Sequence, residues 1–142
     1  MKPVKLTMQA FGSYGNKTQI DFEQTNQKLF LVTGDTGAGK TTIFDAIVFA
    51  LYGEASSSAN RKEGVILQSQ FVELNIEPFV ELTFSEQQGE NRQLYTVRRV
   101  PRHLKLLTRG TGKNSGTREV TGSVSLIMPD GTEYPQKEAD RK

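Results

Sequence analysis

The residues best suited to chemistry form the pattern Gly-x-x-x-x-Gly-Lys-Thr, which runs from Gly34 to Thr41. This spacing is typical of a P-loop, a Gly-rich turn between a strand and a helix that binds phosphate groups. We expect Gly34, Gly37 and Gly39 to adopt positive φ and to turn their backbone N–H groups toward an anion. The helix that follows would add its unpaired N-terminal N–H donors and the positive end of its dipole.

Three side chains at the end of the pattern have separate expected roles. Lys40, the catalytic candidate, would contact the β and γ phosphates, and the Thr41 hydroxyl would bind a bridging Mg²⁺ ion. Thr42 would add a second hydroxyl nearby. The alternative is a Gly-rich turn without a ligand, but apolar segments on both sides favour the P-loop. The predicted site comprises Gly34, Asp35, Thr36, Gly37, Ala38, Gly39, Lys40, Thr41 and Thr42.

The segments on either side of the loop must hold it in place. Leu29–Val32 is wholly apolar, which predicts a central strand covered on both faces. A helix is expected from Lys40 to about Tyr52, ending at Gly53, and its apolar residues on nearly every side predict burial on most sides. Asp45 is its one internal charge. A polar group near the nucleotide could meet this carboxylate, although a local hydrogen bond or salt bridge is the commoner explanation.

Alternating apolar and polar residues predict further strands. In the first, at 4–9, the apolar residues should face the core and the others water. The remaining strands are expected at 19–22, 72–77, 79–84, 93–100 and 119–128, with a turn at 129–131. The predicted fold is α/β, a mixed sheet with an antiparallel β meander beside the P-loop strand and helix. Its expected parts are a P-loop unit at 1–53, a mobile loop at 54–67, the meander at 68–134 and the start of a helix at 135–142.

Composition limits the classes of protein to consider. The chain has 142 residues, which is one domain or a piece of one. It has no Cys, which excludes disulfides and thiolate metal sites and fits a reducing compartment. Because neither a long apolar run nor a signal peptide is present, we expect a soluble, cytoplasmic protein.

Positive charge is concentrated in one part of the chain. The net charge is only +2, yet the range 92–118 holds eight Lys or Arg and no Asp or Glu. Such a cluster could bind DNA phosphates without sequence preference, or it could simply be a solvated strand edge. His103 lies in this range, and we expect a polar loop residue rather than a metal ligand. The DNA candidates are Arg98, Arg99, Arg102, Lys105 and Arg109.

Two other segments imitate nucleotide-binding motifs. Ser125–Asp130 resembles an apolar strand ending in an Mg²⁺-binding Asp, but its Pro and the Gly that follows favour a turn. Gly110–Lys113 lacks the upstream Gly of a P-loop and precedes no apolar helix, so we expect a flexible loop tip.

Several blocks together resemble the start of the SbcC family, within the ABC-type ATPase superfamily that also includes SMC proteins and RecF. They are Ala10–Tyr14, Ile20–Phe22, Thr36–Ile47, Phe49–Gly53 and Tyr95–Arg99. The words Asp-Ala-Ile and Ala-Leu-Tyr-Gly in the third and fourth blocks are far more specific than the P-loop alone. Asp35 departs from the family, where Pro is commoner, but the loop binds through its backbone there.

The resemblance implies an amino-terminal piece of an ABC-type ATPase head. ATP with Mg²⁺ would lie between two such heads and drive their dimerisation, and hydrolysis would gate a partner nuclease, SbcD, on double-stranded DNA ends during repair. Ser13 and Tyr14 would approach the nucleotide. The glutamine loop, coiled coils, signature motif and general base would lie elsewhere, so this segment alone should hydrolyse ATP very poorly.

Two other functions remain open. One is an SMC-like or RecF-like clamp, in which ATP controls DNA binding and no nuclease takes part. The other, a compact P-loop kinase or GTPase, is disfavoured because the sequence lacks a guanine-reading Asn-Lys-x-Asp and its later strands should be antiparallel.

Overall fold

The computed structural model describes residues 1–24, 31–37, 39–54, 67–107 and 116–135. Most of the expected mobile loop, the expected loop tip and the expected C-terminal helix lie outside these ranges, as do Ala38 and Arg109. No helix in the described residues has the length and hydrophobicity needed to cross a membrane. The elements are β1 (Lys2–Gln9), β2 (Thr18–Asp21), α1 (Lys40–Tyr52), β3 (Phe79–Gln88), β4 (Asn91–Val100), β5 (His103–Leu106), β6 (Thr117–Val120), β7 (Ser123–Ile127) and β8 (Glu133–Pro135).

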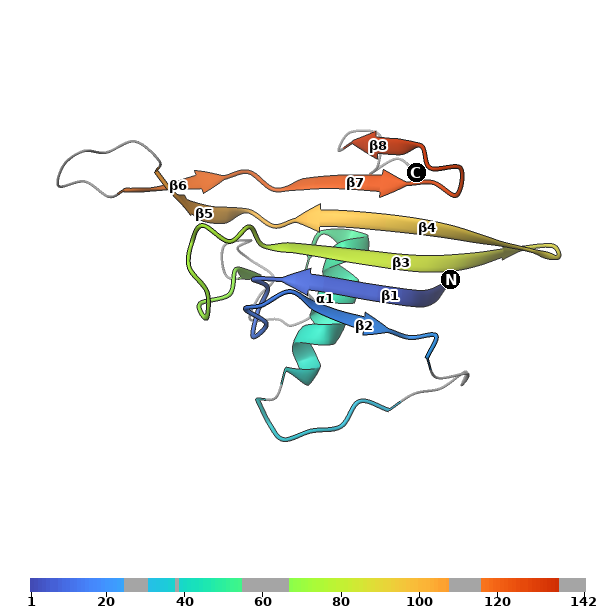
Figure 1. Ribbon diagram of the computed structural model, residues 1–142, viewed down its shortest axis with the longest axis horizontal. Coiled ribbons are helices and arrows are strands. Elements are labelled where there is room, and N and C mark those ends of the chain that lie inside the picture. Colours follow the sequence, from blue (N-terminus) through green and yellow to red (C-terminus); the bar gives the residue numbers. More distant parts are fainter. Residues whose placement is uncertain (25–30, 38, 55–66, 108–115, 136–142) are drawn as a thin grey trace.

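Six strands form one sheet in the order β2-β1-β3-β4-β7-β8, and β5 pairs with β6 in a separate two-stranded sheet (Figure 1). Every pairing among the described strands is antiparallel. The predicted antiparallel meander is therefore confirmed in β3, β4, β7 and β8. The parallel pairing that a mixed sheet requires is not found among the described residues.

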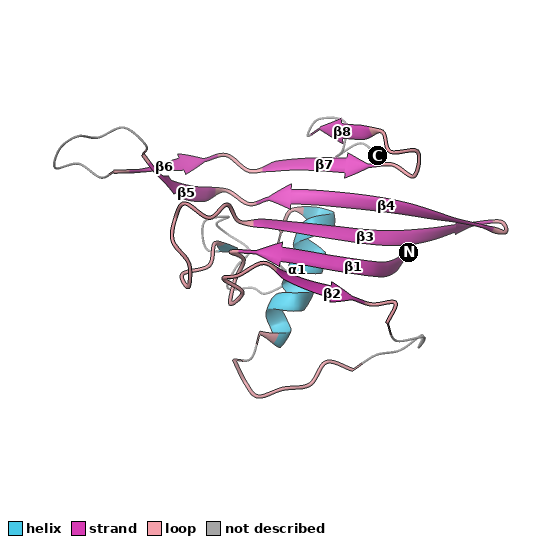
Figure 2. Ribbon diagram, in the orientation of Figure 1, coloured by secondary structure: helices cyan, strands magenta, loops and turns pink. Residues whose placement is uncertain are grey.

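Helix α1 lies across one face of the six-stranded sheet (Figure 2). Strand alternation turns every second side chain toward the helix. Leu82 of β3 stands in register between Leu6 of β1 and Val97 of β4, and all three are buried. The helix contributes Ala46 and Ala50, both without exposed surface. The full buried core comprises Leu6, Met8, Phe11, Phe22, Ile43, Ala46, Phe49, Ala50, Leu67, Val80, Leu82, Val97 and Val124.

The predicted limits of α1 are confirmed. Gly53 ends the helix in a left-handed conformation, φ 78°, and its N–H donates to the Phe49 carbonyl at 2.8 Å. Burial on most sides is not observed, because the described residues cover the helix only where it meets the sheet. Phe44 and Tyr52 remain 57% and 76% exposed.

The expected central strand before the P-loop is wrong for its described part. Leu31 and Val32 form no strand, and Leu31 is 86% exposed, while Val32 packs partly against the core. A strand buried on both faces needs hydrogen-bonded neighbours. The described sheet ends at β2 and β8, and residues 31–33 pair with neither edge.

Three other strand predictions need correction. Residues 72–77 form turns rather than a strand. The strand expected at 119–128 is divided between β6 and β7, which belong to different sheets. The chain changes sheets at Gly122, where a Cβ would lie 2.8 Å from the Val100 carbonyl oxygen. Thr7 is buried although the polar side of β1 should face water, because β1 has register partners on both sides, Gln19 and Glu81.

The predicted turn after β7 is confirmed. The Gly131 N–H donates to the Met128 carbonyl at 2.9 Å, and the Thr132 N–H donates to an Asp130 carboxylate oxygen at 2.9 Å. The hydrogen bond from Thr132 lowers the pKa of Asp130. Asp130 is thus a turn residue at the end of an apolar strand.

Replacing Leu82 by Ala should lower the free energy of unfolding by about 2–5 kcal/mol, because a cavity would open between β1, β4 and α1. Urea denaturation followed by circular dichroism measures the change. Leu94→Ala on β4 is the matched control, since Leu94 is 45% exposed and its loss should have a much smaller effect. Equal losses in the two variants would contradict this account of the core.

Candidate nucleotide-binding site

The Gly-rich loop adopts the expected conformation at two of its three glycines. Gly37 and Gly39 have φ of 85° and 93°, in the left-handed region that favours glycine. Gly34 has φ 159°, close to extended backbone that any residue adopts. Positive φ is therefore structurally required at Gly37 and Gly39 but not at Gly34.

The N-terminus of α1 is open to an anion. Gly39 occupies the N-cap, and no side chain caps the helix. The first turn contains no acidic residue, so no carboxylate competes there. The first backbone N–H groups of a helix have no partner within it, and together with the helix dipole they favour bound phosphate. These features fit the polyphosphate of a nucleotide.

The side chains after Gly39 begin the helix beside the loop. The Lys40 ammonium donates to the Asp35 carbonyl oxygen at 2.7 Å and also to the carbonyl oxygen of Gly34. Lys40 therefore folds back over the loop and neutralises the negative ends of two of its peptide dipoles. Thr41 is exposed, whereas Thr42 is partly buried.

A tight turn at residues 10–15 packs against this helix start. The Ser13 hydroxyl lies 3.0 Å from the Thr42 hydroxyl, and the Tyr14 hydroxyl donates to the Gly39 carbonyl at 3.4 Å. The backbones are close, since a Cβ on Gly12 would lie 2.6 Å from the Thr42 methyl carbon. The structure thus places Ser13 and Tyr14 beside the loop, while their contact with a nucleotide stays a prediction.

A second segment, 67–69, holds this turn and has no signal in the sequence. The Gly12 N–H donates to the Leu67 carbonyl at 2.7 Å, and the Ser69 N–H donates to the Ala10 carbonyl at 2.8 Å. These bonds connect parts of the chain that lie far apart in sequence. Nothing in local residue pattern announces such a pairing.

Asp45 is buried inside α1, 4% exposed. Which of the two expected kinds of partner holds its carboxylate stays a prediction. Within the described ranges, no group of three or more His, Cys, Asp or Glu could hold a metal ion. Thr41 therefore remains the metal-ligand candidate in this part of the chain.

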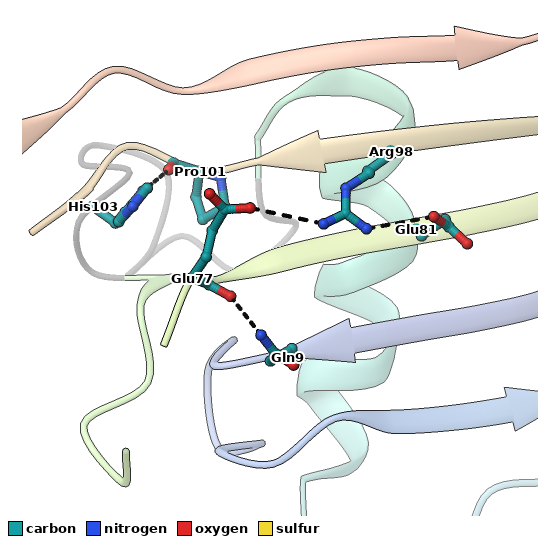
Figure 3. Close-up of polar contacts among 6 residues, drawn as sticks. All are labelled: Gln9, Glu77, Glu81, Arg98, Pro101 and His103. Atoms are coloured by element: carbon teal, nitrogen blue, oxygen red, sulfur yellow. Dashed lines mark hydrogen bonds and ion pairs between the residues drawn. The ribbon is translucent and has the colours of Figure 1, made fainter. Parts of the chain in front are cut away.

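Three of the DNA candidates have partners within the protein. Arg98 lies 3.8 Å from the Phe79 ring centre and forms ion pairs with Glu77 at 3.7 Å and Glu81 at 3.6 Å (Figure 3). Arg99, on the opposite face of β4, donates to the Ala50 carbonyl of α1 at 3.2 Å. A cation suits this end of a helix.

Arg102 completes the set of internally paired arginines, since its guanidinium lies 2.9 Å from a Glu119 carboxylate oxygen. His103 also differs from expectation. It begins β5 and is 3% exposed, and its Nδ1 lies 2.9 Å from the Pro101 carbonyl oxygen (Figure 3). The strand pairing of β5 buries a residue that its polar neighbours had suggested was in a loop.

The exposed positive charge of the basic range lies on the β5–β6 hairpin. Lys105 and Arg118 are both exposed and are register partners, so their side chains leave the same face of the hairpin. Like charges directly opposite one another destabilise a strand pair. Local sequence and structure are in conflict here, as is common where a surface serves a ligand.

Replacing Gly39 by Ala should destabilise the protein more than replacing Gly37 by Ala. Both changes force a side chain into left-handed backbone, at about 1–2 kcal/mol each. A Cβ on Gly39 would also lie 2.9 Å from the Tyr14 hydroxyl, whereas a Cβ on Gly37 would meet no atom within 4 Å. Urea denaturation of the two variants compares these costs, and a larger loss for Gly37→Ala would refute the packing described here.

Comparison with known proteins identifies the family. A model described as an AAA domain matches residues 5–139. The SbcC subunit of nuclease SbcCD from Staphylococcus saprophyticus is 52% identical over 85 residues, 59% of this chain and 8% of that protein. Its counterparts from Lactococcus lactis and Vibrio cholerae are 38% identical over 128 residues and 51% over 59, covering 89% and 41% of this chain.

The chain is short beside these proteins, spanning 11% of the Lactococcus lactis relative and 6% of that from Vibrio cholerae. The resemblance to SbcC predicted from the sequence is nevertheless confirmed by these relatives. Because the family model matches nearly all of its residues, the chain belongs to the AAA domain family.

Proposed function

We propose that this chain is the P-loop segment of an SbcC-type ATPase, and that it binds ATP with Mg²⁺. The observation that carries the proposal is the uncapped N-terminus of α1, preceded by two left-handed glycines and followed by Lys40 and Thr41. The similarity to the SbcC proteins of SbcCD nucleases supports it.

Each residue of the site has a place in this proposal. Backbone N–H groups of residues 34–42 would hold the phosphates, and Lys40 would exchange the Gly34 and Asp35 carbonyls for phosphate oxygens. Thr41 would bind Mg²⁺, whose charge neutralises the phosphates. Ser13 and Tyr14 are near enough to the loop to approach the nucleotide.

The activity proposed for the whole protein goes further. ATP would join two copies of the head, and hydrolysis in that dimer would control an SbcD-type nuclease on double-stranded DNA ends. A dimer would supply groups for hydrolysis that this segment lacks. Support for the nuclease partner is the name of the relatives.

DNA would contact the exposed cations of the β5–β6 hairpin, Lys105 and Arg118, rather than the arginines that have internal partners. An anionic phosphate backbone would relieve the repulsion between these two opposed cations. Arg99 is better explained as a contact of the α1 C-terminus, and Arg98 by its two carboxylates.

The nucleotide proposal is tested with Lys40→Ala in the full-length protein. Loss of a charged hydrogen bond to phosphate should weaken the binding of a fluorescent ATP analogue by about tenfold or more. Lys17→Ala is the control, because Lys17 is exposed and lies outside the loop. Equal affinities of the two variants would reject the assigned role of Lys40.

The DNA surface is tested with Lys105→Gln combined with Arg118→Gln, also in the full-length protein. If both cations contact phosphate, affinity for duplex DNA should fall and the slope of log K against log salt should flatten by roughly 2. Lys2→Gln combined with Lys17→Gln removes two exposed cations elsewhere. An unchanged slope in the hairpin variant, measured by fluorescence anisotropy, would exclude this surface.

A further inference from the structure

Gln68 connects two parts of the molecule that are otherwise separate. Its side-chain amide donates to the Leu104 carbonyl of β5 at 3.0 Å, and its amide oxygen accepts the Leu104 N–H at 2.9 Å. Both backbone groups of Leu104 are thus paired with one side chain, as they would be with a neighbouring strand. Gln68 is buried, 8% exposed, so water is a poor substitute for these bonds.

The backbone of Gln68 belongs to the other part. Residue 68 forms an isolated antiparallel bridge with Phe11, inside the tight turn at residues 10–15. The same turn contacts the start of α1 through Ser13 and Thr42. One residue therefore reaches both the turn beside the P-loop and the first strand of the basic hairpin.

The hairpin needs such a contact to keep a fixed orientation. Its two strands form a sheet apart from the six-stranded one, and a two-stranded hairpin alone is marginally stable in water. Opposed cations, Lys105 and Arg118, weaken it further. The position of β5 therefore depends strongly on the few bonds that fasten it to the rest of the chain.

Thr42 gives this contact a link to the ligand. A hydroxyl has one O–H to donate. If the Thr42 O–H donates to phosphate, Thr42 can only accept from Ser13, so the hydrogen bond between the turn and the helix becomes fixed in one direction. A nucleotide would in this way change how firmly the turn is held, and with it the segment that carries Gln68.

We propose that Gln68 is a positioning residue that transmits the nucleotide state of the P-loop to the β5–β6 hairpin. This inference rests on the proposed binding of ATP at the loop. The route is contiguous: Thr42, Ser13, the turn, Gln68 and Leu104, joined by hydrogen bonds and one strand bridge. ATP binding would thus orient the exposed cations of the hairpin.

The first experiment uses the unsubstituted full-length protein. Hydrogen exchange measured by mass spectrometry should slow in β5 and β6 by about fivefold or more when a non-hydrolysable ATP analogue and Mg²⁺ are added. Lys40→Ala should abolish the change. Unaltered exchange of the hairpin in a protein that has bound the analogue would overturn the inference, whatever the behaviour of any Gln68 variant.

The second experiment removes the contact. Gln68→Met keeps the length of the side chain but cannot bond Leu104, and Gln68→Glu as a carboxylate can accept but not donate. Both variants should bind the analogue as the unsubstituted protein does, yet lose most of the slowing in β5 and β6. Gln70→Met is the matched control, since Gln70 is exposed, and it should keep the full effect. A full effect in a folded Gln68→Met protein would disprove the role of Gln68.

The outcomes separate this inference from the function beneath it. If the unsubstituted protein fails to bind the analogue, the proposed function is wrong and the inference falls with it. If it binds but the hairpin does not respond, only the inference is wrong. A Gln68 variant that fails to fold leaves the first experiment decisive.

Discussion

The structure depends on the close approach of α1 to the middle of the six-stranded sheet. Ala46 and Ala50 have no exposed surface, and their small side chains allow the helix backbone to lie near the strands. Phe49 then meets Phe11, with ring centres 5.5 Å apart. Because Phe11 belongs to the turn that contacts Gly39 and Thr42, apolar packing in the core also fixes the loop at the helix start.

Local pattern predicted much of this fold. The limits of α1, the first strands, the β3–β4 hairpin and the turn around Asp130 all follow from periodicity and from Gly and Pro positions. The P-loop was equally visible, because its residues are consecutive and their types follow from phosphate chemistry. Ser13 and Tyr14 were indicated only by family resemblance, since no residue between them and Gly39 shows that they meet.

The predictions that failed depend on partners distant in sequence. Whether Leu31 joins a strand is decided by its neighbours in space, and Gly122 separates β6 from β7 through its close approach to Val100. The role of Arg99 likewise depends on a helix that ends far earlier in the chain. Gln68 is the clearest example, because a glutamine in an irregular segment gives no hint that its amide replaces a neighbouring strand.

Arg98 and Arg99, adjacent on β4, are held by different surroundings on opposite faces of the sheet. A slip of β4 by one residue would exchange those faces. Arg98 would leave Glu77 and Glu81, Arg99 would leave the end of α1, and Val97 would leave the core. The two arginines therefore act as a lock on strand registration during folding, in a strand whose repeated polar residues would otherwise specify its alignment poorly.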